Sequence, residues 1–145
     1  MRRHRKERDH KIDILSELSL FAACTREELS ELAQLFDEIE RPSGTVLVRE
    51  GDPGKEFYVL VSGVAAATIG GAVVSTLGAG SFFGEMSLLE HAPRSATVTA
   101  ETDVELLVAD ARSFNALVDR APSVGVRMMK LMSERLRSVE THSRA

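Results

Sequence analysis

Apolar residues at helical spacing mark both ends of the chain, while a different pattern fills its middle. Near the start, a short helix is predicted by the apolar positions Ile12, Leu15, Leu18 and Leu20. A second helix is predicted from about Thr25 to Phe36. Its start is a capping box, because the Thr25 hydroxyl can accept from the backbone N–H of Glu28 while the Glu28 carboxylate bonds back to Thr25.

The middle of the chain alternates short apolar runs with glycine turns, which is typical of strands. Gly70-Gly71 fits a two-residue hairpin of type I′ or II′, because those turns need positive φ angles. The predicted strands cover residues 45–49, 57–61, 64–69, 72–77, 96–100 and 104–109. Short strands at this close spacing indicate an all-β barrel or jelly roll.

Helical periodicity returns after the last strand. Asp110 can cap a segment that runs to about Leu117, and Pro122 suits the first turn of a final helix. That helix carries one apolar stripe, made of Val124, Met128, Leu131, Met132, Leu136 and Val139. The predicted fold is therefore mainly β with flanking helices. It is a β-roll, of double-stranded β-helix or jelly-roll type, with helices before and after it.

Length and composition favour one domain in a reducing compartment. The chain has 145 residues, 43% of them hydrophobic and 28% charged, which supports a single core and argues against disorder. No apolar run approaches the roughly 18 residues of a membrane span, and no apolar stretch of a secretory signal follows the basic N-terminus. The single Cys24 cannot form an intrachain disulfide. These features predict a cytoplasmic protein without a transmembrane segment.

Charge is distributed unevenly along the chain. The whole chain carries a net charge of −4, whereas residues 1–11 hold six basic and two acidic side chains and so carry +4. An acidic average disfavours nucleic acid as the main partner, because phosphate backbones attract positive surfaces. We expect residues 1–11 to form a basic arm. The arm is either a solvated terminus or a contact for RNA, an anionic membrane or another protein.

The segment from Leu77 to Val98 carries residues suited to binding an anion. Its glycine-rich turn opens a short helix, whose first backbone N–H groups and positive dipole end favour negative charge. Arg94 follows within reach, and its guanidinium can bond two phosphate oxygens. Glu85, in the first turn of that helix, can accept a hydrogen bond from a ribose hydroxyl. The pattern indicates a ligand with one phosphate charge and a neighbouring hydroxyl group.

Two ordered motifs give the chain a resemblance to a known family. Residues 83–88 (FGEMSL) and 93–98 (PRSATV) resemble the phosphate-binding cassette of cyclic nucleotide-binding domains, the type found in cAMP-dependent protein kinase regulatory subunits and catabolite activator proteins. Residues 51–63 are similar to the family's other signature. The resemblance covers residues 12–139, which leaves 140–145 as a C-terminal tail. We expect a stand-alone, bacterial-like member of this family.

The resemblance implies roles for the cassette residues. Arg94 is similar to the arginine that holds the cyclic phosphate, and Glu85 to the acid that accepts from the ribose 2′-OH. The other ligand-binding residues it implies are Phe83, Gly84, Met86, Ser87, Ser95 and Ala96. Gly84, Met86 and Ser87 are implied to offer close backbone approach and amide donors, while Ser95 and Ala96 are implied to line the phosphate from the strand. The C-terminal helix is implied to act as a lid over the base.

The nucleotide and the residue that contacts its base are less sharply defined. A hydroxyl after the arginine, here Ser95, accompanies cGMP preference in some eukaryotic members, whereas bacterial activators carry Ser and use cAMP. We expect cAMP over cGMP, because one hydroxyl changes a binding free energy by only about 1 kcal/mol. Candidates to cap the purine are Met128, Met129, Met132, Arg127 and Arg135. The alternative for the methionines is that they fill the core.

Two other classes of protein are disfavoured. A cupin-type metal enzyme needs clustered histidine and carboxylate ligands. Of the four histidines, His4, His10 and His142 lie near the termini, and only His91 lies in the middle of the sequence. We therefore expect no catalysis, no metal and no cofactor. A transcription activator needs a helix-turn-helix after the long helix, and we expect no DNA-binding domain because the sequence ends at Ala145.

These observations together predict a regulatory module. We expect ligand binding to shift the position of the C-terminal helix and to act on a separate effector protein. A homodimer through the C-terminal helix is a further expected contact. The alternative is a protein-interaction module of the same fold, with a pocket that is non-functional or has been repurposed.

Overall fold

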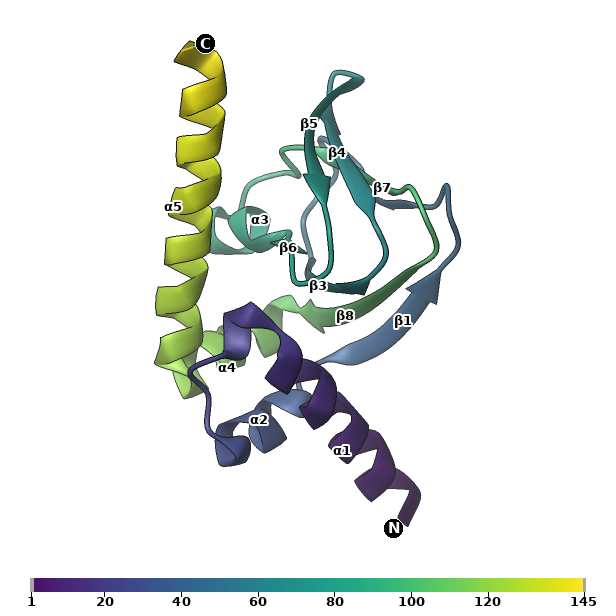
Figure 1. Ribbon diagram of the computed structural model, residues 1–145, viewed down its shortest axis with the longest axis vertical. Coiled ribbons are helices and arrows are strands. Elements are labelled where there is room, and N and C mark those ends of the chain that lie inside the picture. The colour runs from purple at the N-terminus through teal and green to yellow at the C-terminus, as the bar shows by residue number, and fades with distance from the viewer. Residues whose placement is uncertain (1, 145) are drawn as a thin grey trace. The chain divides into compact units, whose positions relative to one another are not determined.

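The strands of the chain form two antiparallel sheets of four strands each, as the computed structural model shows (Figure 1). It describes the backbone of residues 2–144 and the side chains of residues 6–135. The first sheet has the order β1 (Asp37–Arg41), β8 (Val104–Asp110), β3 (Glu56–Ser62) and β6 (Phe82–Phe83). The second has the order β2 (Val46–Val48), β7 (Thr97–Ala100), β4 (Ala65–Ile69) and β5 (Ala72–Leu77). The predicted β-roll with flanking helices is confirmed.

Helices precede and follow the strands, and one short helix interrupts them. Their bounds are α1 (Arg2–Glu17), the 3-10 helix η1 (Ser19–Phe21), α2 (Arg26–Ala33), α3 (Glu85–Glu90), α4 (Ala111–Arg120) and α5 (Pro122–Arg144). The chain divides into two compact units. One is helical and combines the residues up to Ala33 with those from Leu117 onward, and the other is the β-roll, Gln34–Ala116.

The N-terminal helices follow the predicted caps but not all the predicted bounds. The capping box is present: the backbone N–H of Glu28 donates to Thr25 Oγ1 at 3.1 Å, and that of Thr25 donates to Glu28 Oε1 at 2.9 Å. Helix α2 ends at Ala33, so the prediction that it reaches Phe36 was wrong. Helix α1 begins at Arg2 and continues through residues 11 and 12. The domain limits at 11 and 139 stay predictions.

The interior of the roll is built on the central strand β3. Alternate side chains of a strand point to opposite faces, and both faces of β3 are buried. On one face, Tyr58 and Leu60 join the cluster of buried residues that fills the roll. On the other, the ring of Phe57 lies 4.9 Å from that of Phe114 on α4 and 6.0 Å from that of Phe82. Because β3 is buried on both faces, its sequence is a continuous apolar run.

Two strands, β1 and β6, were not predicted from the sequence. Strand β1 has the sequence DEIER, in which four of five residues are charged, and only Ile39 is half-buried. Its pairing with β8, from Asp37 opposite Val108 to Arg41 opposite Val104, supplies the strand geometry that its side chains do not favour. Strand β6 is only Phe82–Phe83, which is too short to show an alternating pattern.

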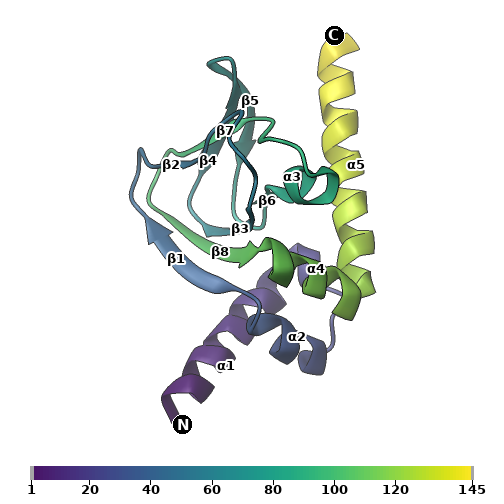
Figure 2. The same ribbon diagram turned by 180° about the vertical axis from the view of Figure 1, so that it is seen from behind.

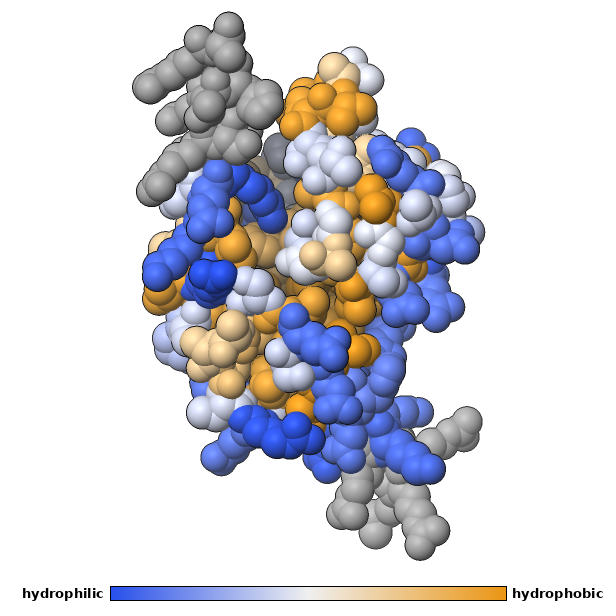
Figure 3. All heavy atoms as spheres, in the orientation of Figure 1, coloured by the Kyte–Doolittle hydropathy of each residue, from blue (hydrophilic) through white to orange (hydrophobic). Residues whose placement is uncertain are grey.

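Strands β4 and β5 form the predicted hairpin, whose outer strand lies at the edge of the second sheet (Figure 2). Gly70 and Gly71 have φ angles of 58° and 85°, which defines a type I′ turn. A shift in the pairing leaves Val74 as an extra residue on β5. Val73 and Val74 are 64% and 52% exposed, and with Ile69 they form the apolar tip visible in Figure 3.

The C-terminal helices begin where their caps predict. The backbone N–H of Ser113 donates to Asp110 Oδ1 at 2.7 Å, which caps α4, and Pro122 is the first residue of α5. Helix α4 extends to Arg120, three residues beyond the predicted end. On α5, Val124 and Met128 are buried as the predicted stripe requires. The side chains of Leu136 and Val139 lie outside the described residues.

Candidate functional site

A short helix bounded by two left-handed residues forms the segment that the sequence singled out. Strand β6 ends at Phe83, and Gly84, with φ of 93°, turns the chain into α3. A Cβ at Gly84 would collide with the Arg94 side chain and the Glu56 carbonyl oxygen, so glycine is needed for space as well as for its φ angle. The helix closes at His91, also left-handed, where the backbone N–H of Ala92 donates to the carbonyl of Ser87 at 3.2 Å.

The loop that carries Arg94 is fastened to a second loop of the roll. The backbone N–H of Arg94 donates to the carbonyl of Asp52, and its carbonyl accepts from the N–H of Gly51, both at 2.8 Å. Pro53 and Pro93 pair as an isolated β-bridge beside these bonds. The two glycine-containing motifs of the sequence are therefore physically joined, and the main chain of Arg94 is held on both sides.

The Arg94 side chain is buried and directed at backbone carbonyl groups. Its residue is only 7% exposed. Nη2 donates to the carbonyl of Glu56 at 2.7 Å, and Nη1 donates to that of Gly84 at 3.2 Å. These bonds occupy two of the five N–H donors of the guanidinium. Burial lowers the pKa of Arg94, and the nearby Tyr58, Glu56 and Glu85 oppose that effect. Arginine nevertheless stays charged, so the site holds a desolvated cation.

Glu85 and Ser87 are the other buried polar residues of the segment. Glu85, in the first turn of α3, is 4% exposed and interacts electrostatically with Arg94. Ser87 is 5% exposed, and its side chain lies against the backbone of Gly54, where a Cβ would collide with it. The structure thus brings together Arg94, Glu85 and the start of α3, which are the three parts that sequence reasoning combined.

The remaining predicted site residues differ in exposure. The ring of Phe83 stacks on that of Tyr58, with centroids 4.8 Å apart and an interplanar angle of 9°, inside the core of the roll. Met86 is 45% exposed, and Ser95 is also exposed. Ala96 is half-buried and packs against the core of the roll. Their contacts with a ligand stay predictions.

Sequence reasoning missed Tyr58 and Glu56. The guanidinium carbon of Arg94 lies 6.0 Å from the centroid of the Tyr58 ring, which is within the range of a cation–π interaction. The Tyr58 hydroxyl donates to Glu56 Oε1 at 3.2 Å. Burial and the Glu56 carboxylate raise the pKa of Tyr58. The FYVLV run reads as core, and a carbonyl acceptor leaves no side-chain signal, so neither contact was visible in the sequence.

Residues proposed for the base contact lie in the helical unit. Met128 is buried and Met129 is exposed, while Met132 and Arg135 are half-buried. Arg127 Nη2 donates to Ser19 Oγ at 2.7 Å, which ties α5 to η1. A role for any of these residues at the base stays a prediction.

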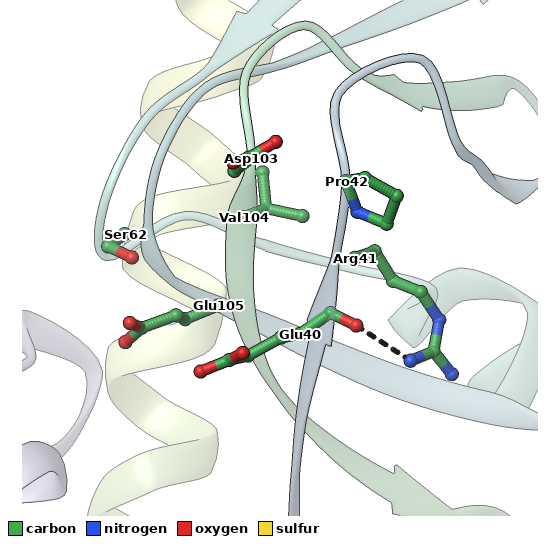
Figure 4. Close-up of a pocket in the computed structure, with 7 residues that line it drawn as sticks. All are labelled: Glu40, Arg41, Pro42, Ser62, Asp103, Val104 and Glu105. Atoms are coloured by element: carbon green, nitrogen blue, oxygen red, sulfur yellow. Dashed lines mark hydrogen bonds between the residues drawn. The ribbon is translucent and has the colours of Figure 1, made fainter.

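A second hollow of the roll has the wrong charge for an anion. It has a volume of about 510 Å³ and is lined by residues of β1 and β8, with the carboxylates of Glu40, Asp103 and Glu105 (Figure 4). Arg41 extends away from Glu105 and donates to the carbonyl of Glu40 at 2.8 Å. Because carboxylates repel a phosphate, the Arg94 segment remains the candidate site.

Two features are absent from the part of the chain that the structure describes. No described helix is long and apolar enough to cross a membrane. Within the same residues, no group of three or more histidine, cysteine, aspartate or glutamate side chains is arranged to hold a metal ion.

The family to which the chain belongs is defined by a match over most of the roll. Residues 38–121 match the model of the cyclic nucleotide-binding domain. That range contains the joined loops, α3 and Arg94. The chain therefore belongs to the cyclic nucleotide-binding domain family.

Individual relatives agree with this assignment. The chain is 36% identical over 108 residues to the cAMP-dependent protein kinase regulatory subunit of Pyricularia oryzae, a match that covers 73% of this chain and 28% of that protein. Among solved structures, Thermus thermophilus catabolite activator protein is 32% identical with a TM-score of 0.75, covering 86% of this chain and 61% of that one. The regulatory domain of Toxoplasma gondii protein kinase A, crystallised with cAMP, is 27% identical with a TM-score of 0.78, covering 89% and 51%.

The relatives are longer than this chain. It spans about a quarter of the length of the fungal regulatory subunits that it matches. The resemblance therefore concerns a cyclic nucleotide-binding regulatory domain, and the activities of the whole relatives do not transfer with it.

Proposed function

We propose that this chain binds a cyclic nucleotide at the Arg94 segment and prefers cAMP to cGMP. The observation that carries the proposal is the buried Arg94 guanidinium, whose two hydrogen bonds in the described structure go to carbonyl groups. A desolvated cation is costly unless an anion or several acceptors compensate its charge. A singly charged cyclic phosphate supplies that anion, and it can take two further N–H donors of the same guanidinium.

Glu85 complements the phosphate contact. It begins α3 and is buried beside Arg94, so its carboxylate can accept a hydrogen bond from a ribose 2′-OH while the backbone N–H groups of the cassette face the phosphate. Gly84, Met86 and Ser87 contribute backbone approach in this proposal. Ser95 and Ala96 line the phosphate from the loop that precedes β7, and Phe83 supports the site through its stack on Tyr58.

The nucleotide preference and the output are finer parts of the proposal. The relatives with cAMP in their names support cAMP, and the exposed Ser95 hydroxyl distinguishes the two purines only weakly. Ligand binding shifts the equilibrium position of α5 and so acts on an effector protein or a second copy. Hydrogen exchange of the α5 amides, measured with and without cAMP, tests this coupling because only a change in their protection supports it.

Thermal unfolding with nucleotide tests binding. With cAMP at about a hundredfold its dissociation constant, the domain gains about 2.7 kcal/mol of stability, and cGMP at the same concentration gives a smaller gain. Arg94→Lys keeps the charge but loses the two-pronged contact, and it abolishes the gain. The exposed Arg49→Lys is the matched control and retains it. The absence of any shift at millimolar nucleotide would refute binding and leave a protein-interaction module as the alternative.

The ribose contact has its own test. Wild-type protein binds cAMP more tightly than 2′-deoxy-cAMP, by about tenfold, because a hydrogen bond to a charged group contributes about 1.5 kcal/mol. Glu85→Gln weakens cAMP binding and reduces the discrimination between the two ligands. Equal discrimination in wild type and variant would show that the 2′-OH meets a different residue.

A further inference from the structure

Beside α3, the roll contains another hollow, of about 500 Å³, which is distinct from the one lined by Glu40, Asp103 and Glu105. It is lined by Leu88 of α3 and by His91, the residue that follows this helix. The joined loops at Pro53 and Pro93 and the first turns of α4, at Ala111 and Asn115, also line it. All of these residues belong to the β-roll unit, so the hollow is defined by this unit alone.

The hollow is separated from the Arg94 guanidinium by a layer one residue thick. Gly54 and Ser87 line it and lie in contact with each other. A Cβ at Gly54 would lie 3.3 Å from the guanidinium carbon of Arg94. A ligand bound in the hollow therefore contacts Gly54 and Ser87, which also support the proposed phosphate site.

The lining is mostly apolar and includes the positively charged Lys55, in a chain with a net charge of −4. Its apolar side chains are those of two prolines, two alanines and Leu88. The ionisable side chains in the lining are Lys55 and His91, both basic, and its described residues include no carboxylate. Asn115 adds an amide that can donate to an oxygen. Apolar walls with a few convergent polar groups are characteristic of small-molecule sites, and the basic groups select a negative charge.

We propose that this hollow is a second ligand site, which takes a small organic acid: one carboxylate on a compact apolar body. The carboxylate lies near Lys55 and Asn115, and the apolar body packs between Leu88 and the two prolines. Because the site adjoins Gly54 and Ser87, its occupation changes the affinity of the Arg94 segment for nucleotide, and the nucleotide changes the affinity for the acid by the same factor. This coupling rests on the proposed function, whereas the site itself does not.

Chemical-shift titration of the ¹⁵N-labelled full chain, without nucleotide, tests the site. The probes are indole-3-acetate and its neutral amide, indole-3-acetamide. The acid shifts the amides of Lys55, Leu88 and Asn115 saturably, with a dissociation constant of about 1 mM, and the neutral amide binds about threefold more weakly. Lys55→Gln reduces this difference, and the exposed Lys130→Gln does not.

A substitution that fills the hollow provides a second test of the site. Ala111 is exposed and lines the hollow, so Ala111→Trp occupies the space and abolishes the shifts, whereas Trp at the exposed Ala72 of β5 leaves them unchanged. Absence of saturable shifts up to about 20 mM, about twentyfold the expected dissociation constant, or their persistence in Ala111→Trp, would overturn the site. Calorimetry with cAMP then tests the coupling. An unchanged cAMP affinity at saturating acid would overturn the coupling, and nucleotide that fails to bind at all would count against the proposed function alone.

Discussion

Arg94 donates from Nη2 to the carbonyl oxygen of Glu56 at 2.7 Å, although 38 residues separate the two in the chain. Glu56 begins β3, so this bond fixes the position of the guanidinium relative to a central strand of the roll. The carboxylate of the same residue accepts from Tyr58, whose ring lies beneath the guanidinium. Glu56 therefore holds both the cation and its aromatic platform, which makes it a positioning residue.

Two substitutions at Tyr58 separate its hydroxyl from its ring. Tyr58→Phe removes the bond to Glu56 and lowers the free energy of unfolding by about 1 kcal/mol. Tyr58→Leu also removes the stack on Phe83 and the contact with Arg94, so it costs more, by about a further 1 kcal/mol. Urea denaturation measures both values. A Leu variant as stable as the Phe variant would mean that the ring contacts contribute nothing.

Alanine substitutions at Gly54 and at Gly78 are expected to change the stability of the roll in opposite directions. Neither has a positive φ angle, but a Cβ at Gly54 meets Ser87 and one at Gly78 meets open space. Gly54→Ala therefore destabilises the roll by about 1–3 kcal/mol through overpacking. Gly78→Ala stabilises it by about 0.4–1 kcal/mol, because alanine restricts the unfolded chain. Thermal unfolding of the two variants gives shifts of opposite sign. Shifts of the same sign would contradict the contact with Ser87.

The reciprocal bonds between Thr25 and Glu28 predict a non-additive pair of substitutions. Thr25→Ala removes the acceptor for the Glu28 amide and costs about 1 kcal/mol. Glu28→Ala removes the acceptor for the Thr25 amide. In the double variant the losses fall short of their sum by about 0.5 kcal/mol, since the bonds support each other. Strict additivity in a double-mutant cycle would show that the two bonds form independently.

The cap at Asp110 makes part of the stability depend on pH. The hydrogen bonds from Ser113 lower the pKa of Asp110 below its ordinary value of 3.8. A carboxylate with a depressed pKa in the folded state stabilises the fold above the unfolded value and loses that contribution as pH falls through the folded one. Wild type therefore loses more stability than Asp110→Asn as pH falls from about 5 to 3, the range around the Asp pKa. Parallel pH profiles in urea denaturation would contradict this role.

Local patterns in the sequence determined much of the fold. Glycine pairs, capping residues and apolar spacing located the hairpin, α2, α4 and the start of α5, because each depends on groups within a few residues of one another. Strand β1 escaped because its charged residues have low strand propensity, and only the pairing with β8 makes it a strand. Helix α2 ends at Ala33, and Phe36 lies beyond it with its ring 6.5 Å from that of Phe57, a contact that helical spacing does not predict.

The sequence indicated which residues the candidate site contains, and their roles toward a ligand stay predictions. The order of Gly84, Glu85 and Arg94 indicated an anion site, since a glycine turn that opens a helix offers backbone N–H groups and Arg94 follows within reach. The burial of Arg94, its carbonyl acceptors and the Tyr58 platform were decided by tertiary structure. Two loops about forty residues apart in sequence pair around Arg94, and backbone carbonyls that serve as acceptors are the same in every residue type. The sequence thus determined which charged residues the candidate site contains. The packing of β3, α3 and the joined loops determined that Arg94 is buried and that its guanidinium is directed at backbone carbonyl groups.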